Sequence, residues 1–385
     1  MAGNFVQLHN HTHYSLLDGA SKVPDLVKRV KELGMPAVGI TDHGNMHGAY
    51  ELWRAAVDSG VKPIIGIEAY VTPETARQDK TRVSWDTNWT PVPGHARNPD
   101  DVSGGGLITH LTMWAENDEG LVNLIKASSV ANLEGRVMRY PRMDKEVLST
   151  YSKGVIASSG CPSGIIQTRL RLGQFDEALR AAGEFQDIFG KDNFYIELMD
   201  HGLSIESKVT GDLLTIAKKL GAPLLATNDS HYVMEADKDA QDAMLCINSG
   251  ATLDDPNRFK FEGSGYYIKS AEEMRELFKD HPDACDNTLL IAERCNVMFD
   301  DHEDGAFMPQ FPCPEGWDET SLFLKKVEEG LEKRYDGNPP MEVLKQADYE
   351  CGVICQMQFC GYFLVVADYI NWAKEHGVMV GPGRG

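Results

Sequence analysis

The sequence lacks the patterns of a secreted or membrane protein. Its eight cysteines include no Cys-x-x-Cys pair, which in a chain of 385 residues argues for reduced thiols rather than a disulfide framework. No apolar run approaches the roughly 20 residues of a membrane span, and the N-terminus has no basic segment followed by an apolar one. We therefore expect a cytoplasmic protein without a signal peptide or a membrane-spanning helix.

Positive charge is also scarce. The chain has 37 lysines and arginines against 58 aspartates and glutamates, a formal net charge of −21. Such a balance repels nucleic acid. A role on nucleic acid would therefore need a pocket filled with cations, or basic regions on a partner or on polypeptide outside this sequence.

Apolar runs and helical periods alternate along the first 240 residues. The runs predict strands at residues 5–8, 37–41, 64–67, 107–112, 154–158, 193–198 and 223–227, with helices between them. Such alternation implies a parallel sheet covered by helices, and seven roughly equal units favour a closed α/β barrel. A doubly wound open sheet is the alternative.

Ligand-type side chains accompany these predicted strands. His9 and His11 lie on the same side of an extended backbone, because strand side chains alternate between faces. The carboxyl ends of barrel strands form the single face where active sites are built, so we expect nine side chains to converge there. They are His9, His11, Asp18, His43, Glu68, His110, Cys161, Asp229 and His231.

Nine such groups exceed the needs of one ion. At three or four protein ligands per ion they predict two or three divalent metals. Imidazole and carboxylate suit zinc, manganese or iron, with magnesium a further candidate, and the Cys161 thiolate favours zinc at one position. Such clusters activate water at phosphoryl centres, which makes phosphoester hydrolysis the expected reaction class. The competing interpretation is a set of ordinary hydrogen-bonded histidines and a buried thiol.

Three further features have two readings each. His201 lies near the same face and could contact a phosphate or act as a general acid. Cys351 and Cys355 lie one turn apart on an amphipathic helix, where packing explains them better than metal binding. The polar segment 72–106 is too long for an ordinary loop, so we expect a lid over the site or partial disorder.

The pattern changes after about residue 260. We expect a first domain at residues 1–280 and a mostly helical connecting segment at 281–385, which stops within a glycine-rich turn and suggests a truncated chain. The predicted elements are a strand at 266–268, helices at 271–279, 286–295, 319–334, 341–358 and 363–376, and a linker at 300–317.

Taken together, the motifs resemble the PHP (polymerase and histidinol phosphatase) domain, in the form found at the N-terminus of bacterial C-family replicative DNA polymerases. Residues 361–368 and the terminal Gly-Pro-Gly-Arg-Gly are similar to the beginning of the polymerase palm in that family. The motifs are His9-Asn10-His11, Tyr14-Ser15, Asp18-Gly19, Thr41-Asp42-His43-Gly44, Glu68, His110, Gly160-Cys161-Pro162-Ser163 and Asn228-Asp229-Ser230-His231.

The resemblance implies a distorted seven-stranded barrel with a trinuclear site. By this likeness one metal is held by His9, His11, Glu68 and Asp229, a second by Glu68, His110 and Cys161, and a third by Asp18, His43 and His231.

Because none of these ligands is missing, the resemblance implies an active 3′–5′ exonuclease that proofreads during DNA replication. The implied partners are the 3′ end of a primer strand and replisome subunits such as the sliding clamp. The family's palm aspartates would follow Gly385, so we do not expect this chain to polymerise DNA. Two alternatives remain, a small-molecule phosphoesterase and an idle module that binds metals structurally while it stabilises the polymerase or docks a partner.

Overall fold

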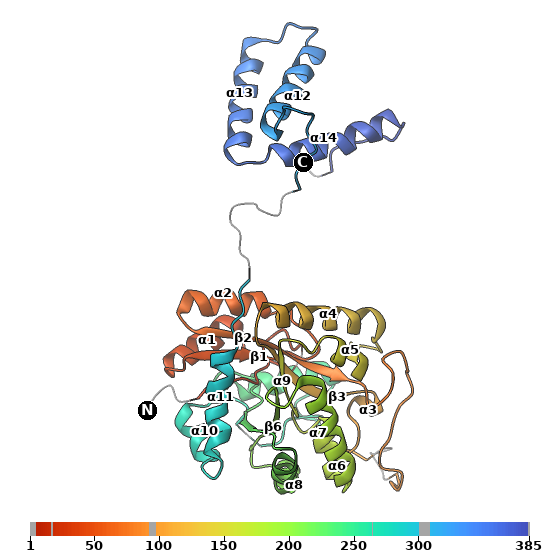
Figure 1. The fold of residues 1–385 in the computed structure, drawn as a ribbon, viewed down its shortest axis with the longest axis vertical. Helices are drawn as coiled ribbons and strands as arrows, with labels where there is room; N and C mark the ends of the chain where they lie inside the picture. The colour runs from red at the N-terminus through yellow and green to blue at the C-terminus, as the bar shows by residue number, and fades with distance from the viewer. Residues whose placement is uncertain (1–4, 17, 92–97, 264, 300–308, 384–385) are drawn as a thin grey trace. The chain divides into compact units, whose positions relative to one another are not determined.

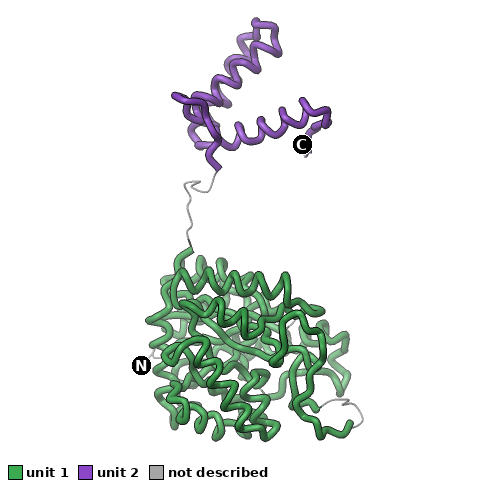
Figure 2. The backbone as a smooth tube through the Cα atoms, turned by 45° about the vertical axis from the view of Figure 1, so that its right-hand side comes forward, with its two compact units in different colours: residues 1–299 green, residues 300–385 purple. Residues whose placement is uncertain are grey.

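The computed structural model describes residues 5–16, 18–91, 98–263, 265–299 and 309–383. Two compact units, Met1–Phe299 and Asp300–Gly385, are distinguished by colour in Figure 2. Each unit is described by itself.

The first unit is built on a seven-stranded sheet. Its order is β1-β2-β3-β5-β6-β7, with β4 paired beside β2. Neighbours in the sheet follow the order of the chain, without the reversal of strand order that defines a doubly wound sheet. The strands are β1 (Ala37–Ile40), β2 (Lys62–Val71), β3 (Thr109–Ala115), β4 (Arg142–Met143), β5 (Val155–Ser158), β6 (Phe194–Leu198) and β7 (Leu224–Ala226).

One strand runs against the others. β3 is antiparallel to both β2 and β5, whereas the other pairs are parallel, so the expectation of a wholly parallel sheet is wrong at β3. A parallel neighbour needs a crossover, usually a long helix, and the described part of the preceding connection contains only the four-residue α3 (Ser103–Gly106). The reversal places the first residues of β3 beside the last residues of its neighbours.

The N-terminal segment closes the sheet between β7 and β1. Gly39 donates its N–H to Gln7 O at 2.8 Å, and His11 donates to Ser230 O at 2.7 Å. These contacts are isolated bridges, so the strand predicted at 5–8 is not a regular one. The expected fold class, a distorted α/β barrel followed by a mostly helical segment, is confirmed.

Helices cover the outside of the barrel (Figure 1). α1 and α2 lie side by side, as do α10 and α11. Asn117 accepts from Gly120 N to cap α4, and Ser270 with Glu273 forms a capping box on α10. The helices are α1 (Val23–Glu32), α2 (Ala49–Ser59), α4 (Asp118–Glu134), α5 (Lys145–Thr150), α6 (Ile165–Arg171), α7 (Phe175–Phe189), α8 (Ser204–Leu220), η1 (Glu235–Asp237), α9 (Lys238–Ser249), α10 (Ala271–Leu277) and α11 (Pro282–Arg294).

An apolar cluster fills one end of the barrel. Ile64 lies near the start of β2 and Trp114 near the end of the reversed β3, so both belong to the end opposite His110. Ile291 and Ala292 of α11 pack into the same cluster. α11 therefore belongs to the core of the first unit.

The polar segment 72–106 is anchored at two places in its described part. The buried Arg142 guanidinium donates to Arg77 O and Asp79 O, each at 2.7 Å. The Arg169 guanidinium lies over the Trp85 ring, 3.7 Å from the ring centroid. Residues 92–97, and with them any disorder expected there, lie outside the described residues.

The second unit consists of α12 (Glu319–Arg334), α13 (Met341–Gln356) and α14 (Cys360–Glu375) around a small apolar cluster. The buried Cys351 and Cys360 pack in this cluster. Of the predicted linker, residues 300–308 lie outside the described residues. In the part of the chain that the structure describes, no single helix has the length and apolar composition to cross a membrane; α13 and α14 meet that test only as a pair bent by 114°.

Candidate metal centre

All nine candidate ligands come together at one end of the barrel. The reversed β3 brings His110 to the end where β2, β5 and β7 deliver their ligands. Close contacts connect the set: Glu68 meets His9, His43 and His110, Asp229 meets His9, His11 and His231, Asp18 meets His43, and Cys161 meets His110.

Glu68 lies at the middle of the cluster. Its Oε2 atom is 2.5 Å from His43 Nδ1 and 3.0 Å from His110 Nδ1, while Oε1 is 3.4 Å from His9 Nε2. Burial alone would raise the pKa of Glu68, but His110 and His43 hold it well below its usual range. The strand predicted at 64–67 is too short, because β2 continues past Glu68 to Val71, paired there with β3.

A second grouping joins His9, His11 and Asp229. Asp229 Oδ1 is 3.0 Å from His11 Nε2 and 3.4 Å from His9 Nε2. Asp229 has a φ of +43°, a conformation that non-glycine residues adopt at a cost. Burial would raise the pKa of this carboxyl, but His9 and His231 outweigh it and lower the pKa.

The remaining ligands lie on either side of Glu68. His43 Nε2 is 3.3 Å from Asp18 Oδ2, and the His231 ring stacks on His11 with centroids 4.4 Å apart. Cys161 Sγ is 3.3 Å from His110 Nδ1. Burial, followed by Glu68 and Asp229, raises the pKa of the Cys161 thiol well above its usual value.

The donor set fits divalent cations. Asp18 Oδ1 and His231 Nε2 are buried, and each lacks a hydrogen-bond partner among the described residues. Both carboxylate oxygens of Glu68 lie near imidazole nitrogens without hydrogen-bond geometry, so these groups face a shared space rather than one another. A buried polar atom left unpaired costs about 1–3 kcal/mol. Imidazole, carboxylate and thiolate around such a space are the ligands of a transition metal or zinc.

A surrounding layer of side chains orients the ligands. The Glu197 carboxylate accepts hydrogen bonds from Thr227 Oγ1, at 2.6 Å, and from Ser158 Oγ. Its Oε1 atom also lies 2.7 Å from His9 Nδ1. Burial would lower the pKa of His9, but Asp229 and Glu197 raise it well above its usual value. We did not identify Glu197 from the sequence; a carboxylate inside the apolar strand Phe194–Leu198 was the available signal, since such a group needs buried partners.

Asp42 orients the loop that carries His11. It accepts from Thr12 N and from Ser15 Oγ, both at 2.7 Å. Ser15 Oγ in turn lies 3.0 Å from His11 Nδ1. His11 therefore turns its Nε2 atom toward Asp229.

His201 has a different environment. Its Nδ1 atom lies 2.6 Å from Glu206 Oε1, and its Nε2 atom lies 2.9 Å from Asn228 O. The ring also stacks on Tyr266 at 4.1 Å. Both ring nitrogens thus have oxygen partners outside the nine ligands, and the residue supports the loop that carries Asp229.

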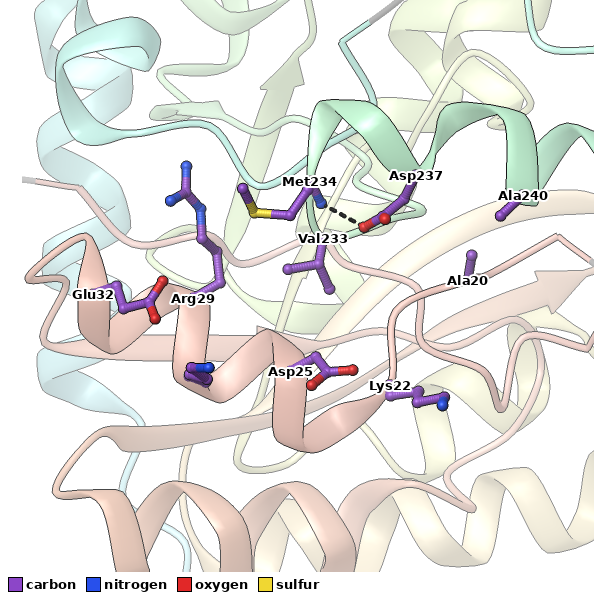
Figure 3. Close-up of a pocket in the computed structure, with 10 residues that line it drawn as sticks. Ala20, Lys22, Asp25, Arg29, Glu32, Val233, Met234, Asp237 and Ala240 are labelled. Carbon is purple, nitrogen blue, oxygen red and sulfur yellow. Dashed lines mark hydrogen bonds between the residues drawn. The ribbon is translucent and has the colours of Figure 1, made fainter.

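A separate cavity of about 410 Å³ lies between α1 and residues 233–240 (Figure 3). Met234 N donates to the Asp237 carboxylate at 2.8 Å on one wall. Charges of both signs line the cavity, including Arg29 and Glu32 of α1. Among the described residues, those that line this cavity include none of the nine candidate ligands.

Comparison with known proteins identifies the family. The family described as "PHP domain" matches residues 7–201, about half of the chain. The chain belongs to the PHP domain family. The family described as "Bacterial DNA polymerase III alpha NTPase domain" matches residues 321–385.

Relatives of this PHP chain are named DNA polymerase III subunit alpha. The protein of Mycobacterium leprae is 51% identical over 99% of this chain and 32% of its own length. The protein of Treponema pallidum is 40% identical over 99% of this chain and 31% of its own length. The chain therefore spans about a third of the length of these relatives. A solved two-domain protein from Bacteroides vulgatus contains a predicted PHP-like metal-dependent phosphoesterase. It matches at 14% identity with a TM-score of 0.35, over 74% of this chain and 62% of that one.

Proposed function

We propose that this chain is part of a bacterial replicative DNA polymerase, and that its PHP barrel is a metal-dependent 3′–5′ exonuclease that proofreads during DNA replication. The observation that carries the proposal is the convergence of nine candidate metal ligands, several of which have buried polar atoms without a hydrogen-bond partner among the described residues. The names of the relatives support the connection to replication. DNA, the sliding clamp and other replisome subunits in the cytoplasm are the partners that this role requires.

The burial of the ligands indicates how substrate would approach. The side chains of His9, His11 and Glu68 are wholly buried, whereas those of Asp18, His43, Asp229 and His110 are 22%, 15%, 14% and 12% exposed. Two or three zinc, manganese, iron or magnesium ions would supply a water of lowered pKa and stabilise the phosphoryl oxygens. The buried ligands would hold the ions, and Asp18 and His43 would face the scissile phosphodiester.

A mismatched primer tests the proposal. The chain is loaded with manganese or zinc and incubated with a 5′-labelled primer–template that ends in a 3′ mismatch. We expect stepwise shortening of the primer from its 3′ end, faster than with a paired end, and at least a 100-fold slower rate with Asp18→Asn. Absence of nucleotide release, with the metals shown to be bound, would rule out the exonuclease.

A second candidate is a barrel in which the metals are structural and the unit stabilises the polymerase or docks a partner. Complete burial of His9, His11 and Glu68 favours it, because structural metal sites are closed. For this candidate, chelation lowers the melting temperature of the barrel, while wild-type protein and Asp18→Asn release nucleotide equally slowly. A clear difference in rate between the two proteins excludes it.

A further inference from the structure

A segment of alternating basic and aromatic residues borders the metal centre. This segment, Arg258-Phe259-Lys260-Phe261, connects α9 to the strand-like residues 266–268. The Phe261 ring packs edge-on against His231, one of the nine ligands, with centroids 4.7 Å apart. The Phe259 ring packs edge-on against Phe261 at 6.0 Å and is 61% exposed. A line of rings thus runs from solvent to the centre.

The segment is fixed to the same wall as Asp18. Arg258 forms a two-point ion pair with Asp242 of α9, with both N–O distances 2.5 Å. From the same helix, Gln241 Nε2 donates to Asp18 O at 3.1 Å. A cavity of about 470 Å³ lies between α9 and the segment, lined by Gln241, Arg258, Lys260 and Phe261 among others. Phe259 and Phe261 are therefore held beside the ligands.

The charge of the chain limits what this segment could bind. At a net charge of −21, phosphate attraction alone would not retain DNA. Stacking of a base on a phenyl ring needs no positive field and is available to every base. Lys260 is exposed and forms no ion pair among the described residues, so its ammonium is available to a phosphate.

We propose that residues 258–261 bind the unpaired 3′ end of a DNA strand, with bases stacked on Phe259 and Phe261 and a phosphate at Lys260. This inference rests on the proposed function. An unpaired base can present both of its faces to the rings, and a mismatched end costs the least to unstack. The segment thus selects frayed 3′ ends and leads them past Phe261 to the side of the centre formed by His231 and Asp18.

Fluorescence of a 3′-terminal 2-aminopurine measures this stacking directly. A single-stranded oligonucleotide with a phosphorothioate last linkage, which resists cleavage, is titrated with the whole chain loaded with manganese. We expect quenching with the wild-type protein. We expect about tenfold weaker binding for Phe259→Leu, which keeps the apolar bulk but loses the aromatic face, and near-normal binding for Phe259→Tyr.

Leu253→Ala is the matched control, because Leu253 is 56% exposed in the same connection and contributes no ring. We expect wild-type affinity for this control, and unchanged melting temperatures for all variants. Wild-type affinity in Phe259→Leu would overturn the inference. So would an equal loss in Phe259→Tyr, since stacking would then not be the cause.

Hydrolysis of bis(p-nitrophenyl) phosphate by the wild-type chain separates this inference from the proposed function. Quenching that depends on Phe259, without hydrolysis of the small ester, supports the binding segment and counts against the exonuclease. Hydrolysis of the ester, together with wild-type affinity in Phe259→Leu, supports the phosphodiesterase and overturns the binding segment.

Discussion

His9 directs its Nε2 atom toward Glu68 and Asp229 because Glu197 holds its Nδ1 atom at 2.7 Å. Glu197→Gln keeps the volume but places an amide where Ser158, Thr227 and His9 all need an acceptor. Since partners that orient metal ligands typically contribute 10–100-fold to affinity, we expect a loss of that order in metal affinity. Titration of the metal-free chain with zinc or manganese measures it.

Glu206→Gln provides a matched control for that substitution. Glu206 also pairs with a histidine at 2.6 Å, but its partner is His201, outside the nine ligands. We expect Glu206→Gln to lower metal affinity much less than Glu197→Gln does, because His201 reaches the ligand Asp229 only through Asn228 O. Equal losses in the two variants would show that Glu197 has no specific role in holding His9.

His11 makes the metal-free barrel sensitive to acid. Burial, together with His43 and His231, lowers its pKa to about 3, whereas the unfolded ring titrates near 6.5. Its contribution to stability is therefore complete above about pH 6.5 and is lost as the pH falls toward 3. His9 and His43 have raised pKa values, so their contributions are already complete below about pH 6.5 and stay constant in this window.

We therefore expect the free energy of unfolding of the metal-free chain to fall as the pH is lowered from about 6 to about 4.5. The fall should be steeper than in His11→Asn by up to about 1.4 kcal/mol per pH unit. Urea denaturation at the two pH values measures the difference. Parallel slopes for wild type and His11→Asn would contradict the expectation.

At the scale of the element, closure of the barrel depends on a close approach at Gly39. A methyl group there would lie 2.3 Å from Leu8 O and 2.8 Å from Leu8 Cα, both backbone atoms that cannot turn aside. We expect Gly39→Ala to lower the free energy of unfolding by about 1–3 kcal/mol and to weaken metal binding, because His9 follows Leu8 directly. Denaturant titration and metal titration of the same samples provide both measurements.

Gly211→Ala is the control for this substitution. Gly211 lies inside α8 with nothing within 4 Å of an added methyl group, so alanine should stabilise the chain by up to about 1 kcal/mol. Wild-type metal affinity in Gly39→Ala would show that the N-terminal segment does not need this contact to place His9.

Local patterns predicted most of the elements, and failed where tertiary context decides. Periodicity placed α12 at its observed bounds. It could not give the direction of β3, which follows from a connection without a crossover helix. We did not predict α9, whose first five residues include no large apolar side chain. The nine candidate ligands could be collected because each belongs to a motif, whereas Glu197 acts only through contacts with distant residues.

At the scale of the molecule, the described units divide at Phe299, and α11 is part of the barrel's core. A functional division after residue 280 stays a prediction. The palm-like resemblance of residues 361–368 falls within α14. The relatives are about three times as long as this chain.

The acidic balance predicts how the isolated chain should bind DNA. Each phosphate contact on single-stranded DNA contributes about −0.7 to the slope of log affinity against log salt concentration. If base stacking dominates and Lys260 supplies the main phosphate contact, we expect a slope near −1 between about 50 and 200 mM salt, and a slope nearer zero for Lys260→Gln. The 2-aminopurine titration repeated in increasing KCl measures both. A slope of about −4 or steeper would contradict this expectation. It would mean that several basic residues of this chain contact DNA phosphates, despite the net charge of −21.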